Sequence, residues 1–263
     1  MNLVTKMNRF SRIAATSIAV AGIFALAACN EENKTTVGKT ATGLERSETL
    51  YIGGFDWAPP STFNPLDYDP NFPIDGNCRI AYEALLAYNQ LNGELEPMLA
   101  DSYTSSENSI SVHLDPRARW NNGNPVTVDD VLYTFKIDSL LPTPRHGNWN
   151  FLSRITDDGN NNITFHFGKN KNPLIILNAL AETSILPKSV FEPLIQGAKS
   201  GKGYDMNLIT EFKNDSMPVF SGPYTLKTFS PDQIVLERND NYWGNVKFGG
   251  KSPSPKYIIH SLY

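Results

Sequence analysis

The chain has 263 residues, of which 40% are hydrophobic and 11% aromatic, so it is long and apolar enough to form a substantial core. Its 18 glycines, 18 prolines and low charged fraction of 19% favour a loop-rich α/β protein over a helical bundle. A net charge of −4 provides no basic surface for nucleic acid, and two cysteines exclude a disulfide framework.

Residues 1–28 have the composition of an export signal. Lys6, Arg9 and Arg12 make the amino end positive, and residues 13–28 form an uncharged, alanine-rich apolar run. The run is short for a membrane span, which needs roughly 20 residues. Without this segment the chain has 20 basic and 27 acidic residues, a net charge of −7. We predict that residues 1–28 are a signal peptide.

Cys29 directly follows Leu-Ala-Ala at the end of the apolar run, a pattern that resembles a bacterial lipobox. The resemblance implies cleavage before Cys29 and attachment of lipid to it, with the protein facing the periplasm or the cell exterior. The alternative is a plain secretory signal with a chance cysteine. Residues 29–48 are polar and are predicted to be a flexible tether, spanning about 25 Å root-mean-square. Cys78 would then be a lone thiol, expected to be buried as a small hydrophobic residue.

A short β-type run at 49–52 leads into a loop rich in glycine, aromatic residues and proline. Glycine permits unusual backbone conformations, and the prolines prevent the chain from continuing a strand or starting a helix. Such a loop after a strand is a usual place for a ligand contact. The predicted ligand-binding residues here are Gly54, Phe55, Asp56, Trp57 and Ala58. The alternative is that the aromatic side chains only cover the edge of the sheet.

The next stretch predicts a helix, a strand and a second helix. Apolar residues at 80, 84, 85 and 88 suggest a helix over 80–88 with Asn77 as its N-cap. Alternation over 109–114 predicts a strand on which His113 faces solvent. Thr127 and Asp130 have capping-box spacing before a helix over 129–140. Capping explains Asp129 and Asp130 better than acid–base or metal chemistry does.

A polar loop at 141–150 contains Arg145, His146 and Trp149 and is predicted to contact a ligand carboxylate or a sugar face, with Trp149 as the ligand-binding residue; plain surface exposure is the alternative. A second strand pair is expected from Ile155 to 167, with a turn at 157–159. Asn172 and Pro173 predict the start of a helix over 174–181. Pro187 opens another helix, and the Gly/Lys-rich segment 196–207 is expected to be a mobile loop.

The last third of the chain predicts a β-hairpin and a final strand. Runs at 220–226 and 235–238 flank a turn that contains Pro231 and Asp232. Tyr242 and Trp243 are expected to pack against the core rather than contact ligand. Residues 255–263 are again strand-like.

Several motifs together resemble one protein family. They are Pro-x-Leu-Ala-x-Ser at 97–102, Trp-x-Asn-Gly-x-Pro-Val-Thr-x-Asp-Asp-Val at 120–131, Ser-Gly-Pro-Tyr-x-Leu at 221–226 and Leu-x-Arg-Asn-x-x-Tyr-Trp-Gly at 236–244. The order and content of these motifs are similar to family 5 extracellular solute-binding proteins, the peptide-, oligosaccharide- or nickel-binding receptors of bacterial ABC importers. The resemblance covers nearly all of 49–263.

The resemblance implies a fold of the type II periplasmic-binding-protein class, a mixed α/β lobe. A larger subdomain would comprise 49–76 and 177–263, and a smaller α/β subdomain, 77–176, would be inserted into it. The test of this arrangement is that residues 49–52 share a sheet with strands beyond Ser221 and not with 109–114. Family members usually continue for roughly as long again, so the second lobe is absent. The chain is then a gene fragment, or a separate polypeptide supplies the other lobe.

The implied function is capture of a peptide, which can pair with the backbone of the loop at 54–58, and its delivery to ABC permease subunits. An oligosaccharide ligand is the first alternative, favoured by Phe55, Trp57 and Trp149. The second is an exported interaction or structural lipoprotein without transport function. Half a cleft should bind weakly and leave sheet edges exposed. No nucleophile elbow, Walker loop, dinucleotide fingerprint or zinc spacing occurs, so catalysis, a cofactor and a metal are not expected.

Overall fold

A computed structural model describes residues 43–53, 62–67, 80–142, 147, 150–169, 171–230 and 232–261. Residues 48–263 form one compact unit, separate from residues 1–47. Apart from one short turn, the elements described below belong to the unit 48–263. At the end of the predicted tether, Arg46–Glu48 form a single 3₁₀ turn, η1. The predicted signal peptide and the rest of the tether lie outside the described residues.

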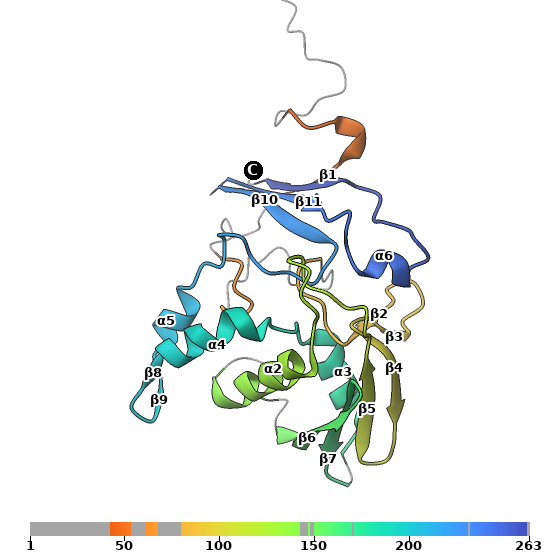
Figure 1. Cartoon of the computed structure of the whole chain (residues 1–263), viewed down its shortest axis with the longest axis vertical. Helices are drawn as coiled ribbons and strands as arrows, with labels where there is room; N and C mark the ends of the chain where they lie inside the picture. Colours follow the sequence, from red (N-terminus) through yellow and green to blue (C-terminus); the bar gives the residue numbers. More distant parts are fainter. Residues whose placement is uncertain are drawn as a thin grey trace, which may run out of the picture. The chain divides into compact units, whose positions relative to one another are not determined.

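One four-stranded sheet has the order β1-β12-β11-β10 (Figure 1). Its strands are β1 (Thr49–Gly53), β10 (Tyr224–Ser230), β11 (Gln233–Arg238) and β12 (Tyr257–Ser261). The first strand pairs in parallel with the last, and the other pairs are antiparallel. The predicted sheet membership of residues 49–52 is therefore confirmed, as are the hairpin and the final strand.

A second sheet is antiparallel, with the order β4-β5-β7-β6. It contains β4 (Ala100–Ser105), β5 (Ser109–Leu114), β6 (Leu152–Gly159) and β7 (Asn162–Phe167). The alternating apolar residues of β5 and β7 enter the core, so the predicted strands at 109–114 and 155–167 are confirmed. Asn160 and Asn161, both with left-handed φ angles, turn the chain between β6 and β7.

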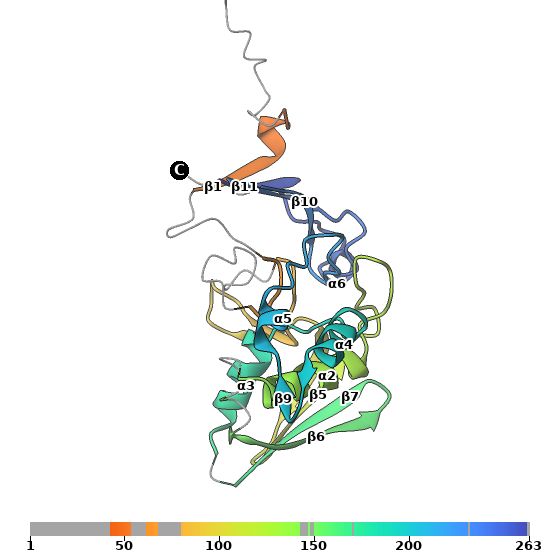
Figure 2. The same cartoon turned by 90° about the vertical axis from the view of Figure 1, so that its left-hand side faces the viewer.

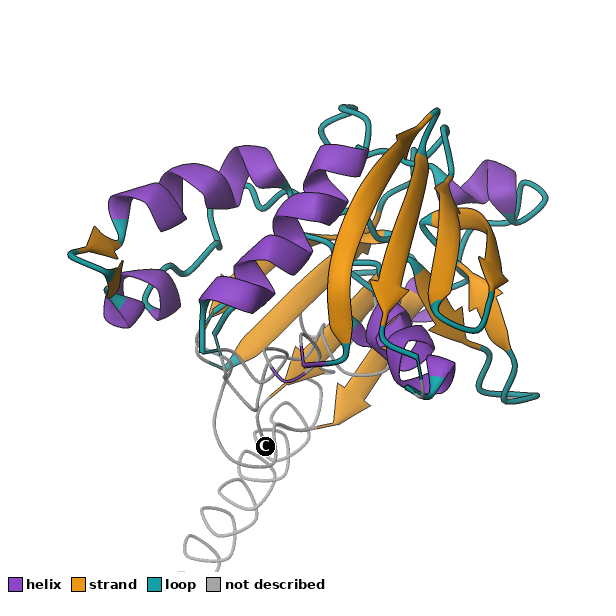
Figure 3. Cartoon of the chain, turned by 90° about the horizontal axis from the view of Figure 1, so that it is seen from below, coloured by secondary structure: helices purple, strands orange, loops and turns teal. Residues whose placement is uncertain are grey.

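Helix α2 (Val128–Leu140) begins with the predicted capping box: the Thr127 side chain accepts from the Asp130 amide, and the Asp130 carboxylate accepts from the Thr127 amide. One side of α2 lies on the second sheet (Figure 3), and the ring centroids of Phe135 and Phe165 are 5.0 Å apart. Its Tyr133 and Ile137 pack instead with the side chains of α4 (Lys188–Gly197). Figure 2 shows α4 beyond α2, away from β6 and β7.

Helix α3 (Pro173–Glu182) starts as predicted, with the Asn172 side chain accepting from the Leu174 amide. The segment 196–207, predicted to be a mobile loop, has regular secondary structure over much of its length. It contains the end of α4, a small hairpin of β8 (Lys199–Ser200) and β9 (Gly203–Tyr204), and the start of α5 (Met206–Thr210). Burial of Ala198 and capping of α5 by Asp205 provide the local order that low apolar content did not suggest.

The helix predicted over 80–88 is wrong. Residues 80–85 are irregular, and the chain continues into β2 (Leu86–Tyr88), which pairs with β3 (Leu95–Pro97). Residues 81–86 are all at most 1% exposed. Their carbonyls accept hydrogen bonds from distant segments, for example Ala81 from Gly222 and Glu83 from Ile185. A segment buried on every side cannot be recognised by a one-sided apolar pattern.

Candidate functional site

The predicted ligand-binding residues Gly54, Phe55, Asp56, Trp57, Ala58 and Trp149 lie outside the described residues, as does Cys29. The structure describes the chain on both sides of the loop at 54–61, and these flanking segments define where the loop starts and ends.

The loop starts at the carboxyl end of β1. Because β1 is parallel to β12, with Gly53 opposite Ser261, the carboxyl ends of both strands lie at the same edge of the sheet. In open α/β sheets, ligands bind in the crevice outside the carboxyl ends of the strands. The loop thus leaves the sheet at the edge where a ligand site is expected.

The loop ends at a segment, 62–67, that is hydrogen-bonded to residues 209–214. The Phe63 amide donates to the Lys213 carbonyl at 2.7 Å, and the Asn64 side chain donates to the Ile209 carbonyl at 2.7 Å. The Asn214 amide group donates to the Phe63 carbonyl at 2.9 Å. The Phe63 ring is fully buried, so the segment that follows the loop is anchored in the core.

A buried polar cluster around Glu83 joins three distant parts of the chain. Glu83 is 1% exposed, and its carboxylate accepts hydrogen bonds from the Tyr242 hydroxyl and, at 3.0 Å, from the Trp243 indole. Its backbone amide donates to Ser221 Oγ at 2.9 Å. Tyr242 and Trp243 therefore have the predicted packing role, and they also carry hydrogen bonds that the sequence did not suggest.

Burial dominates the electrostatics of this cluster. It raises the pKa of Glu83 from 4.5 to about 8, although the bonds from Tyr242 and Trp243 and the charge of Lys247 oppose the shift. Burial and the adjacent Glu83 also raise the pKa of Tyr242 above its ordinary value. Tyr242 is thus a hydroxyl donor to Glu83 throughout the physiological range.

Lys247 lies beside this cluster on α6 (Gly244–Lys247). Its ammonium group donates to the carbonyls of Met98 and Ala100, and burial lowers its pKa despite the nearby carboxylates. Asp115, 4.0 Å from the ammonium, is held by Arg117 through two side-chain hydrogen bonds. Burial of Asp115 would raise its pKa, but the bonds from Arg117 outweigh this and keep it low. These contacts fix α6 to β3 and β4.

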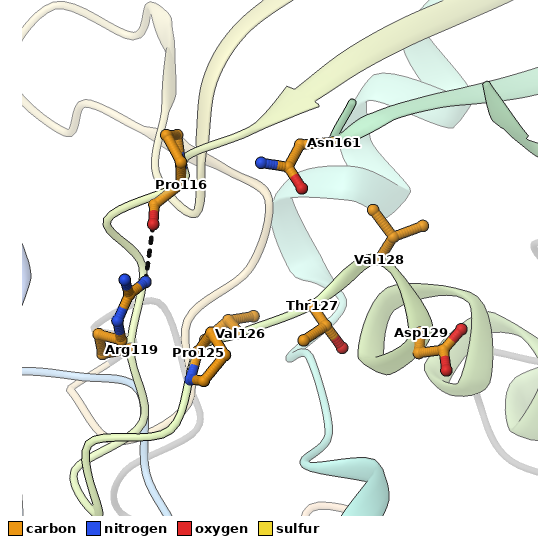
Figure 4. A pocket seen from close by; sticks show the side chains of 8 residues that line it. All are labelled: Pro116, Arg119, Pro125, Val126, Thr127, Val128, Asp129 and Asn161. Carbon is orange, nitrogen blue, oxygen red and sulfur yellow. Dashed lines mark hydrogen bonds between the residues drawn. The ribbon is translucent and has the colours of Figure 1, made fainter. Parts of the chain in front are cut away.

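A surface recess of about 390 Å³ lies where the loop after β5 meets the start of α2. Its walls include Pro116, Pro125 and Val128, and its polar groups come from Arg119, Asp129 and Asn161 (Figure 4). The loop is rigid, because the Arg119 guanidinium donates to the carbonyls of Pro116 and Ala118 at 2.7 and 2.8 Å. Sequence reading placed the Trp-x-Asn-Gly-x-Pro motif here but did not predict a recess.

Two of the described histidines form local hydrogen bonds. His113 is half-buried and bonds Asp101 at 2.8 Å, so it is less solvated than predicted. His166 bonds Thr156 at 3.1 Å. Among the described residues, no three His, Cys, Asp or Glu side chains are grouped to hold a metal. Asp130 acts in the capping box, as predicted, and also accepts from the Lys188 amide.

The architecture is that of a lobe of a two-lobed periplasmic binding protein. A 31% identical oligopeptide ABC transporter periplasmic protein from Thermotoga maritima, solved with mannohexaose bound, superposes on 84% of this chain with a TM-score of 0.68. The Bacillus subtilis oligopeptide-binding protein AppA, solved with a nonapeptide, superposes on 82% with a TM-score of 0.65 at 22% identity. The predicted fold class is thereby confirmed.

Residues 94–263 match the bacterial extracellular solute-binding proteins, family 5 Middle, and the chain belongs to this family. It is 32% identical over 212 residues to the peptidoglycan-binding protein YepA of Agrobacterium fabrum. The chain spans 30% of that relative's length and 38% of the Thermotoga structure. The family is extracellular, so its members are exported. Within the described residues, no helix is long and apolar enough to cross a membrane.

Proposed function

We propose that the protein is part of the extracytoplasmic substrate-binding component of an ABC importer, which captures peptides and delivers them to the permease. Family membership supports this, as does the description of the Thermotoga relative as an oligopeptide-binding protein. The observation that carries the proposal is the position of the two segments on either side of the loop at 54–61. Strand β1 ends before it at the same edge of the sheet as β12, and residues 62–67 after it are hydrogen-bonded to residues 209–214.

Calorimetric titration of the purified protein with pools of short peptides tests this function. Trp57→Ala should weaken binding, because stacking and burial of a large aromatic side chain would be lost. Phe248→Ala is a matched control, since Phe248 is an exposed aromatic residue on another element. Equal peptide affinity of the wild type and Trp57→Ala would contradict a ligand contact by this loop.

An oligosaccharide is the second candidate ligand. The Thermotoga relative was solved with mannohexaose, and peptidoglycan, which the name of the Agrobacterium relative specifies, contains both sugar and peptide. Phe55, Trp57 and Trp149 are the residues proposed to stack on sugar rings. Binding of cello- or chito-oligomers without any binding of peptides would replace the peptide proposal with this one.

We also propose that Cys29 carries the lipid that attaches the protein to a membrane, with residues 29–48 as the tether. The support is the sequence pattern at 26–29 and the extracellular nature of the family. Metabolic labelling with a fatty acid tests it: wild type should incorporate the label and fractionate with membranes, whereas Cys29→Ser should do neither. Labelling of Cys29→Ser would show that the lipid is elsewhere.

The remaining part of the proposal concerns assembly. Residues 77–176 would be a subdomain inserted between 49–76 and 177–263. Strand order supports the insertion, because β1 pairs with β12, near the other end of the chain, while β5 and β7 from the middle of the chain pair in a different sheet. No catalysis is proposed. A thermal-shift screen against peptide and sugar pools that gives no response, with an aggregated sample, would favour a lipoprotein without transport function.

A further inference from the structure

The recess beside α2 contains an arginine whose charge is not balanced by an acid. Among the described residues, Arg117 is paired with Asp115 and Arg238 with Asp240, but Arg119 forms no ion pair. One of its terminal nitrogens, Nη1, is bound by the carbonyls of Pro116 and Ala118. The guanidinium is therefore held in place while its other N–H groups stay available to a ligand.

The two acids at the start of α2 have partners other than this arginine. Asp130 accepts hydrogen bonds from the Thr127 amide and hydroxyl and from the Lys188 amide. Asp129 is paired with the Lys188 ammonium at 3.3 Å. Because neither carboxylate pairs with Arg119, its free N–H groups can bind an anionic group through charge-assisted hydrogen bonds.

The rest of the lining limits the ligand further. Pro116, Pro125, Val126 and Val128 provide aliphatic walls. Figure 4 shows the Asn161 side chain directed into the recess. Its side-chain amide has no hydrogen-bond partner among the described residues. A volume of about 390 Å³ is at the small end of the range of ligand pockets, which suits the end of a short peptide.

We propose that this recess binds the carboxyl terminus of a short peptide that ends in a small aliphatic residue. Arg119 pairs with the terminal carboxylate, Asn161 donates a hydrogen bond to it, and the proline and valine side chains contact the aliphatic side chain. The inference deepens the proposed function, on which its choice of a peptide depends. It adds a contact outside the loop at 54–58.

Backbone amide NMR of the purified protein, titrated with Gly-Gly-Ala and with Gly-Gly-Ala-amide, tests the proposal. The free acid should shift the amide signals of 116–129 and 161, and the amidated peptide should bind at least about tenfold more weakly, as expected for loss of a charge-assisted hydrogen bond. Arg119→Gln should bind the free acid more weakly than the wild type does, by the same factor of about ten. Arg154→Gln, an exposed arginine on β6, is the control and should bind like the wild type.

Two further titrations separate this inference from the proposed function. In Trp57→Ala, the shifts at 116–129 should persist even if the overall affinity for longer peptides falls. Sodium acetate should produce weaker shifts at the same residues than the peptide does. Equal binding of the free acid and the amide, or no shifts at 116–129 at millimolar peptide, would overturn the recess proposal and leave the loop proposal standing.

Discussion

At the scale of single residues, the most informative group is Glu83, a carboxyl side chain placed at the centre of the core. It has no buried cation within hydrogen-bond distance among the described residues; the hydroxyl of Tyr242 and the indole of Trp243 bind it instead. Neutral donors compensate an ionised buried carboxylate only in part, which is why burial prevails and the pKa rises to about 8.

Glu83 should make stability depend on pH in the neutral range. Its folded-state pKa, about 8, lies above the ordinary 4.5, so its contribution is complete below pH 4.5 and is lost as pH rises through 8. We expect the free energy of unfolding to fall by up to about 1.4 kcal/mol per pH unit across this window. Urea unfolding between pH 5 and 9 measures it.

Glu83→Gln is the control, because the amide keeps an acceptor for Tyr242 but does not titrate. Its stability should change much less between pH 5 and 8 than that of the wild type. A wild-type profile as flat as that of Glu83→Gln would show that Glu83 is ionised at little cost in the folded protein.

Gly222 is required by close packing rather than by an unusual φ angle. A Cβ atom here would lie 2.4 Å from the Ile80 carbonyl oxygen, and the three nearest atoms are all backbone of Ile80 and Ala81, which cannot rotate away as a side chain could. Gly222→Ala should destabilise the protein by about 2 kcal/mol or more. Gly197→Ala, where a Cβ has open space at the end of α4, should be neutral or slightly stabilising in the same urea titration.

At the scale of elements, local patterns predicted those structures whose determinants lie close together in sequence. The capping box of α2, the Asn172 cap of α3 and the β10–β11 hairpin depend on neighbours within a few residues. The helix predicted over 80–88 failed because its surroundings are residues 98–100, 185 and 221–224, which no local window contains. The hydrogen bond from Trp243 to Glu83 joins residues 160 positions apart, and no sequence pattern predicted it.

The capping box of α2 provides a prediction at this scale. Thr127→Ala removes an acceptor for the Asp130 amide and a donor to the Asp130 carboxylate, so we expect a loss of about 0.5–2 kcal/mol in urea unfolding. Ser139→Ala, near the other end of the same helix, loses only an exposed bond to the Lys136 carbonyl and should be close to neutral. Equal effects of both variants would argue against capping.

At the scale of the whole molecule, the sequence was sufficient for the family and the sheet membership of β1, because both depend on motif order. For the candidate site, the sequence predicted only the loop at 54–58 and Trp149, which lie outside the described residues. The recess was missed because Arg119 and Asn161 are 42 positions apart along the chain and are brought together by the pairing of β5 with β7.

Removing the carboxyl-terminal segment provides a test at this scale. A chain that ends at residue 218 lacks Ser221, Tyr242 and Trp243 and three of the four strands of the first sheet. We expect it to be unfolded by circular dichroism and rapidly degraded by trypsin, whereas a chain that starts at residue 43 should resist. A protease-resistant chain of 218 residues would show that 80–142 and 171–210 fold without the Glu83 cluster.

The burial of 81–86 has a consequence for synthesis and secretion. These residues emerge from the ribosome early, yet the groups that complete them, such as Ser221, follow 138 positions later. Until then the nascent polypeptide has no finished core, and closing contacts over such separations is slow. The growing chain would therefore still be unfolded, which is the state required by translocation machinery that threads only extended polypeptides.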